Sequence, residues 1–117
     1  MAVTVATFRK LALAQPEAAE VGHMGHPDFR VKNKIFATLG YPDKGHGVVK
    51  VNTEQREGLV DAEPHAFTPV PGGWGRTGAT IVNLGTVSLN ALAAAIEMAW
   101  GNVAPKKLVA ARRANPE

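Results

Sequence analysis

The sequence predicts an α+β fold, in which an antiparallel sheet with two β-hairpin wings packs against helices. The β-branched and aromatic residues typical of strands gather in neighbouring short runs, which do not alternate regularly with helical segments. Two segments, residues 4–14 and 88–100, instead repeat apolar residues at the spacing of a helix face. The length of 117 residues suits one domain, residues 1–117, with a single core.

The N-terminal segment is expected to form a helix followed by a strand. Phe8, Leu11 and Ala12 share one helix face within residues 4–14. The helix ends before Pro16, because the residue preceding a proline avoids helical backbone angles. Residues 17–24 are interpreted as a partly covered strand.

The first β-hairpin is expected over residues 26–39. Its loop is Lys32-Asn33, since Asn tolerates the left-handed backbone that two-residue loops need. The same register turns Ile35 and Leu39 towards the side of Arg30. The resulting cross-strand pairs are Val31 with Lys34, and Phe29 with Phe36 as an aromatic pair.

A strand, a short helix and a second hairpin follow. Residues 48–51 form the strand, which pairs with the second strand of the first hairpin. Asn52 or Thr53 caps the short helix. Residues 66–84 form the second hairpin, whose glycine-rich tip carries Trp74 as a lid on the core.

Two helices complete the predicted fold. Ser88 caps the first of them, which presents an apolar stripe to the core and ends at Gly101. Pro105 opens the second, at the position where a missing N–H costs least. This last helix is the most basic segment of the chain.

Composition narrows the classes of function. The 13 Lys and Arg against 10 Asp and Glu give a net charge of +3, which is compatible with a polyanionic partner. The absence of Cys excludes disulfides, thiol nucleophiles and thiolate metal ligands. The sequence has no cationic signal-peptide start and no apolar run long enough to span a bilayer. We therefore expect a cytoplasmic monomer that does not contact membranes.

Motifs for catalysis and nucleotide hydrolysis are incomplete. Gly73 and Gly78 have the spacing of a P-loop, but Ala79 stands where that motif needs a lysine. Ser88 lies in no Gly-x-Ser-x-Gly elbow and is better used as a helix cap than as a nucleophile. We therefore predict a protein without enzymatic activity and without a cofactor.

His23, His26 and Asp28 come nearest to a metal site. In one extended strand, residues three apart point to opposite faces, so the two histidines are not expected to converge. Zinc or iron normally needs three or four protein ligands. The sequence accordingly predicts no metal site.

Four motifs, in order, resemble the MmcQ/YjbR family: the hairpin HPDFRVKNKIFATL, the passage VVKVNTEQREGLV, the bend PGGWGRTG and the closing AW…APKKL. The similarity covers about residues 8–108. Its most specific part is the Phe29-Arg30-Val31 and Lys34-Ile35-Phe36 pair. The resemblance implies a fold similar to CyaY and to a double-wing DNA-binding module, and it implies DNA binding.

Clustered cations predict a phosphate-backbone site on the wings and the C-terminal helix. Lys and Arg bind such backbones by displacing counterions, with little reading of bases. The candidate nucleic-acid-binding residues are Arg30, Lys32, Lys34, Lys50, Arg76, Lys106 and Lys107. The alternative is a small-ligand or protein-interaction domain, in which Trp74, Phe67 and the glycine-rich bend line an apolar pocket beside the sheet.

Overall fold

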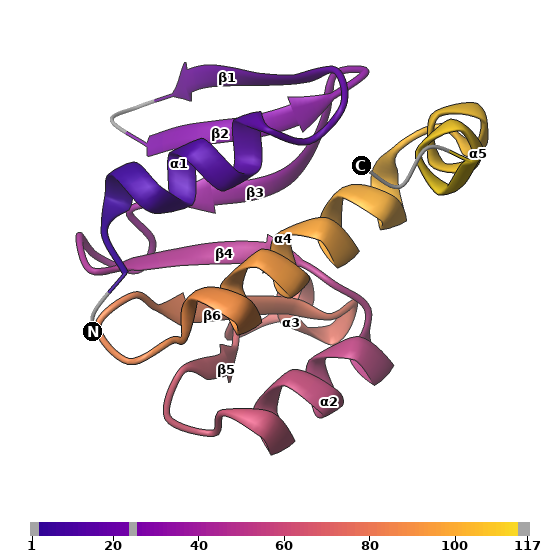
Figure 1. The fold of residues 1–117 in the computed structure, drawn as a ribbon. Coiled ribbons are helices and arrows are strands. Elements are labelled where there is room, and N and C mark those ends of the chain that lie inside the picture. Colours follow the sequence, from indigo (N-terminus) through magenta and orange to yellow (C-terminus); the bar gives the residue numbers. More distant parts are fainter. Residues whose placement is uncertain (1–2, 24–25, 115–117) are drawn as a thin grey trace.

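The computed structural model describes residues 3–23 and 26–114, in which the chain forms five helices and six strands (Figure 1). In order these are α1 (Val5–Leu13), β1 (Ala18–His23), β2 (His26–Val31), β3 (Lys34–Leu39), β4 (His46–Lys50), α2 (Thr53–Ala62), β5 (Phe67–Pro69), α3 (Gly73–Arg76), β6 (Ala79–Asn83), α4 (Leu89–Val103) and α5 (Lys106–Ala114). None of the described helices is long and apolar enough to cross a membrane.

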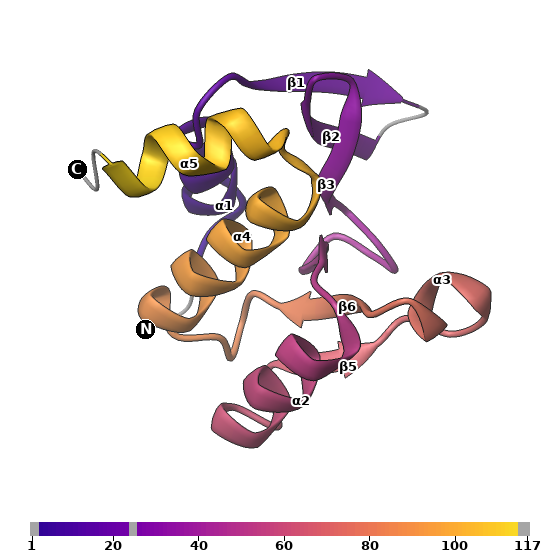
Figure 2. The same cartoon turned by 90° about the vertical axis from the view of Figure 1, so that its right-hand side faces the viewer.

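The six strands form one antiparallel sheet in the order β1-β2-β3-β4-β6-β5. Both predicted hairpins, β2–β3 and β5–β6, are therefore parts of one continuous sheet, and the predicted pairing of β3 with β4 is confirmed. Helices α1 and α4 cover one face of the sheet, whereas the short α3 lies on the opposite side (Figures 1 and 2). The α+β prediction is thus confirmed.

The β2–β3 turn is as predicted, but the register beyond it is not. Lys32 and Asn33 have φ angles of 49° and 67°, the paired left-handed conformation of a type I′ hairpin turn. A bulge then shifts the register, so that Phe29 pairs with Ala37. The expected Phe29–Phe36 pair is therefore wrong. The extra residue lets β3 turn Leu39 into the core, which resolves the conflict that a bulge-free register creates.

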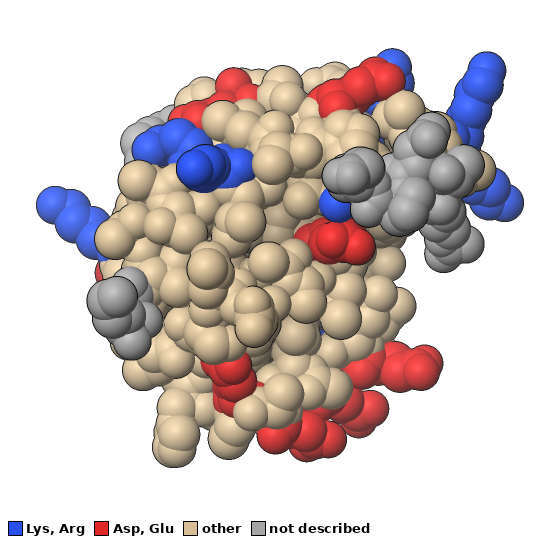
Figure 3. Space-filling model, viewed as in Figure 1, with Lys and Arg blue, Asp and Glu red and all other residues tan. Residues whose placement is uncertain are grey.

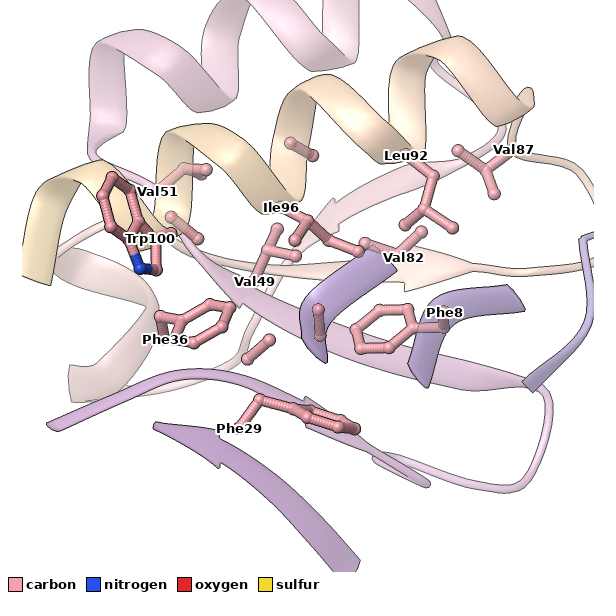
Figure 4. Packing of buried hydrophobic residues seen from close by; sticks show 14 of the residues in the cluster. Phe8, Phe29, Phe36, Val49, Val51, Val82, Val87, Leu92, Ile96 and Trp100 are labelled. Carbon is pink, nitrogen blue, oxygen red and sulfur yellow. The ribbon is translucent and has the colours of Figure 1, made fainter. Parts of the chain in front are cut away.

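The main core lies between the sheet and the helices α1 and α4 (Figure 4). Phe8 of α1 contacts Phe29 of β2, with ring centroids 5.9 Å apart. Trp100 of α4 is buried and donates a hydrogen bond of 2.9 Å from its indole N–H to the carbonyl of Pro16. This bond ties the C-terminal end of α4 to the loop between α1 and β1.

Polar side chains begin the helices as the sequence indicates. Thr4 and Ser88 cap α1 and α4, and Asn52 rather than Thr53 caps α2. Asn52 and Gln55 form a reciprocal capping box, with bonds of 2.7 and 2.9 Å. The predicted end of α4 at Gly101 is wrong, because the helix continues to Val103.

The glycine-rich tip of the second hairpin also differs from expectation. It folds into α3, and Trp74 is 38% exposed instead of covering the main core. The Trp74 ring meets Tyr41 edge-on, with centroids 6.3 Å apart. Phe67, by contrast, is buried in the main core. The alternative pocket lined jointly by Trp74 and Phe67 therefore does not form.

Candidate functional site

Three of the seven candidate cations line one hollow. Lys32 and Lys34 come from the β2–β3 turn, and Lys106 comes from the start of α5. The hollow has a volume of about 610 Å³, and its remaining wall is the α4–α5 connection. We call it the lysine hollow; its lining residues are Lys32, Lys34, Gly101, Asn102, Val103, Ala104, Pro105, Lys106, Val109 and Ala110.

The local fold explains why these lysines face one space. The tight β2–β3 turn presents Lys32 and Lys34 at the tip of a hairpin, and both are exposed. Helix α4 ends beside that tip, and Pro105 starts α5, which exposes Lys106 and Lys107 (Figure 2). Lys32 is neutralised in part, since its Nζ lies 2.7 Å from Glu17 Oε1. Within residues 3–23 and 26–114, neither Lys34 nor Lys106 forms an ion pair.

Arg30 belongs to a different environment. Its guanidinium lies 3.4 Å from Asp28 Oδ2, while Asp28 Oδ1 accepts a 3.0 Å hydrogen bond from the hydroxyl of Thr38. Asp28 and Thr38 are buried. Arg30 therefore serves this polar network on the sheet face opposite to the core, because residues that alternate with Phe29 and Val31 point the other way.

Lys50 and Arg76 are also separated from the lysine hollow. Lys50 shares the sheet face of Val48, two residues earlier on β4, which packs in a small cluster with Val70 and Ala79. Arg76 lies in α3, on that same side (Figure 2). The fold thus brings together Lys32, Lys34 and Lys106 but not all seven predicted residues.

A second hollow adjoins the first. It has a volume of about 580 Å³ and lies along α4 and α5, with Gln55 of α2 at its edge. We call it the carboxamide hollow; its lining residues are Gln55, Ala94, Glu97, Met98, Trp100, Gly101, Asn102, Val109 and Arg112. Gly101, Asn102 and Val109 line both hollows, so the two together form one α4–α5 groove.

Arg112 fixes α5 along this groove. Its guanidinium lies 5.3 Å from the centre of the Trp100 ring and donates to Gln15 Oε1 at 2.8 Å and Glu97 Oε2 at 3.3 Å. These contacts link α5 to α4 and to the loop after α1. Arg112 therefore adds polar and cation–π contacts to the apolar packing of Leu108 and Val109, which also hold this wall of the groove against the core.

Two carboxamides at the junction of the hollows hold each other in place. Asn102 Nδ2 donates to Gln55 Oε1 at 2.8 Å and to the carbonyl of Lys50 at 3.2 Å. Gln55 Oε1 also accepts from the backbone N–H of Asn52. The sequence does not predict this pair. The Asn52-x-x-Gln55 spacing could have revealed Gln55, but nothing in the sequence indicates its contact with Asn102.

The reason given for expecting no metal site at His23, His26 and Asp28 is wrong. His23 and His26 are paired positions of β1 and β2, so the chain reverses between them and they do not lie on one strand as assumed. Asp28 is already engaged by Arg30 and Thr38. Within the described residues, no group of three or more His, Asp or Glu side chains could hold a metal ion.

Fold and groove together define an α+β protein with an open antiparallel sheet, α1 and α4 on one face, the short α3 on the other, and a partly cationic groove at the α4–α5 corner. The YjbR family model matches residues 13–102, so the chain belongs to the YjbR family. The crystal structure of the Deinococcus radiodurans protein DR2400, which contains a DUF419 domain, has a TM-score of 0.72 to this chain at 22% identity. That match covers 97% of this chain and 87% of DR2400, and shows the same fold. No curated protein matches the sequence significantly.

Proposed function

We propose that this chain is a non-catalytic nucleic-acid-binding module, which contacts phosphate backbones at the lysine hollow. The observation that carries the proposal is the convergence of Lys32, Lys34 and Lys106, from elements about 70 residues apart, on one concave surface. Ammonium groups around a hollow attract phosphates by charge and release condensed counterions when they bind. The resemblance of the sequence to a family with a fold similar to a double-wing DNA-binding module also supports a nucleic acid as the partner.

The distribution of charge over the surface also supports this proposal. Acidic side chains gather over α2 in Figure 3, whereas at the opposite end of that view basic side chains project around α5, with acidic side chains also beside them. At that end, Glu17 is paired with Lys32, and Glu97 with Arg112. A polyanion would therefore approach the α5 end and be repelled from α2.

The experiment compares the salt dependence of DNA binding in two double variants. In Lys34→Glu/Lys106→Glu two lysines of the hollow are reversed, and in Lys10→Glu/Lys44→Glu two exposed lysines outside the hollow are reversed. Both variants have the same net charge, so general attraction is matched. We expect the first to lower the log–log salt slope by about 2, one for each lost phosphate contact.

The measurement is a titration of labelled duplex and single-stranded DNA by fluorescence anisotropy at several salt concentrations. Equal affinities and equal slopes for the two variants would contradict a site at the lysine hollow. Circular dichroism checks that both variants keep the fold.

A further inference from the structure

The two ends of the α4–α5 groove differ in chemistry. The lysine hollow carries three ammonium groups, whereas the carboxamide hollow carries two carboxamides, the Glu97–Arg112 pair and an apolar wall from Met98 and Val109. A ligand that lies along the whole groove must therefore be anionic at one end. At the other end it must be flat or apolar, with hydrogen-bonding groups.

The carboxamide pair has a defined orientation and free hydrogen-bonding atoms. The described hydrogen bonds use Asn102 Nδ2 and Gln55 Oε1, and the capping box fixes the latter. Within the described part of the chain, Asn102 Oδ1 and Gln55 Nε2 make no hydrogen bond. The pair thus offers one acceptor and one donor, the combination that the edge of a nucleobase complements.

We propose that the α4–α5 groove binds a single unpaired nucleotide, with its phosphate at the lysine hollow and its base at the carboxamide hollow. The three lysines favour this direction, since they concentrate positive charge at one end, whereas Arg112 at the other end is paired with Glu97. The planar Arg112 guanidinium, held over Trp100, offers a surface on which a base can stack. The inference rests on the proposed function for the assignment of phosphate to the lysines, and adds the recognition of a base.

The size of the groove fits this ligand. Each hollow has a volume of about 600 Å³, within the roughly 300–1,000 Å³ range of sites for small molecules and cofactors. Gly101 lies where the hollows join, and a Cβ added there would have no atom within 4 Å. The groove is therefore open at its middle because this position of α4 carries no side chain.

Gly101 supplies a clean test, because a larger residue there fills the groove without a clash. Gly101→Leu places a side chain at the junction and replaces a helix glycine by a better helix former. Gly58→Leu is the matched control, since Gly58 lies inside α2, has the same free space around its Cβ and lines neither hollow. Both variants are expected to be at least as stable as the wild type.

The probes are ADP, UDP, adenosine and inorganic phosphate, titrated by calorimetry or by amide chemical shifts. We expect a nucleoside diphosphate to bind at least 10-fold more tightly than adenosine or phosphate. Gly101→Leu should weaken that binding at least 10-fold, and Gly58→Leu should leave it unchanged. Inorganic phosphate that binds as tightly as ADP, or equal ADP affinity in Gly101→Leu and Gly58→Leu, would overturn the inference.

These outcomes are distinct from a failure of the proposed function. If Lys34→Glu/Lys106→Glu loses duplex binding while ADP does not bind, the nucleic-acid interface stands and the base-binding groove falls. The source of the nucleotide is resolved by a duplex with a one-nucleotide overhang and its blunt counterpart. Tighter binding of the overhang identifies a strand end as the ligand, and equal binding with measurable ADP affinity identifies a free nucleotide.

Discussion

Individual glycines determine the shape of the bend between β5 and β6. Gly78 has a φ of +115°, and a Cβ there would lie 2.1 Å from the carbonyl oxygen of Val51. At Gly75 a Cβ would lie 1.7 Å from the carbonyl oxygen of Val70, and the Gly75 carbonyl accepts a 2.6 Å bond from Arg56. Close backbone packing therefore requires glycine at 75 and 78, whereas Gly73, the other glycine with P-loop spacing, has no atom within 4 Å of an added Cβ.

Gly78→Ala should destabilise the protein by about 3 kcal/mol or more, because both the backbone angle and the contact with Val51 must change. Gly72→Ala is the control: Gly72 also has a positive φ, of +86°, but nothing lies within 4 Å of its Cβ. That change should cost less, about 1–3 kcal/mol, because only the backbone conformation (φ +86°, ψ −161°), which is essentially restricted to glycine, opposes it. Urea unfolding measures both values, and equal losses would contradict the role of the close contact.

The carboxylate of Glu63 links the end of α2 to the start of α4. It accepts from the backbone N–H of Ser88 at 2.9 Å and from the Ser88 hydroxyl at 2.5 Å. The hydroxyl bond first, and the backbone bond second, lower the pKa of Glu63 below its usual value of 4.5, against a small opposing effect of burial. Each bond favours the ionised carboxylate.

The lowered pKa of Glu63 determines how its contribution to the folding stability depends on pH. A lowered folded-state pKa means that the stabilisation is present above the unfolded pKa and is lost as the pH falls through the folded value. Glu63→Gln should therefore be less stable than the wild type near neutral pH, and the difference should shrink as the pH drops below about 4.5. Since Glu63 is only half-buried and solvent screens its charge, the effect is small, about 0.5 kcal/mol. Thermal unfolding between pH 7 and pH 3 measures it; a difference that grows on acidification would contradict the assignment.

At the scale of elements, the sequence predicts what local chemistry decides. The Lys32-Asn33 turn, the Ser88 cap and the strand pairing of β3 with β4 follow from nearest neighbours along the chain or from simple pairing. The β-bulge beside Phe29 cannot be predicted in this way. It turns β3 residues into a core whose other side is formed by α1 and α4, which lie far away in the sequence. Gly101 fails as a helix end for a similar reason: neighbouring residues of α4 pack against the core and outweigh its low propensity.

Helix α5 should depend on Arg112 more than on any exposed residue. Arg112→Ala removes the contacts with Gln15, Glu97 and the Trp100 ring. We expect amide hydrogen exchange in α5 to accelerate at least 10-fold, while exchange in the middle of α4 changes little. Lys107→Ala, a truncation on the same helix that removes no described hydrogen bond or ion pair, serves as the control. Unchanged exchange in α5 of the Arg112 variant would show that its apolar contacts suffice.

At the scale of the whole molecule, the groove arises from contacts that no motif encodes. Lys106 reaches Lys32 and Lys34 because α4 spans the sheet and the chain turns at Pro105 beside the β2–β3 tip (Figure 1). Clustering in the sequence predicts the same group for Arg30 and Arg76, but strand alternation and the second hairpin carry these two elsewhere. Clustering of charge in a sequence therefore does not predict which cations the fold brings together.

The same long-range packing predicts cooperative unfolding. Residues of α1, α2, α4 and five strands contribute to one main core, and Leu92 of α4 is fully buried within it. Leu92→Ala should cost about 2–5 kcal/mol, the range for a leucine removed from a packed core. Leu89→Ala is the control, since Leu89 lies one turn earlier on α4 and is 54% exposed, and it should cost less than about 0.5 kcal/mol.

The measurement uses a Trp74→Phe background, so that fluorescence reports the buried Trp100 while far-ultraviolet circular dichroism reports helices and strands together. Both signals should follow one transition in urea, and Leu92→Ala should shift both midpoints equally, because a single core couples the sheet to the helices. Trp100 donates a hydrogen bond to the carbonyl of Pro16, and Arg112 of α5 lies over its ring. Unfolding of α5 before the rest of the protein would therefore appear as a separate change in fluorescence. Two transitions with different midpoints would contradict a single cooperative unit and would assign the α4–α5 corner to a less stable part of the fold.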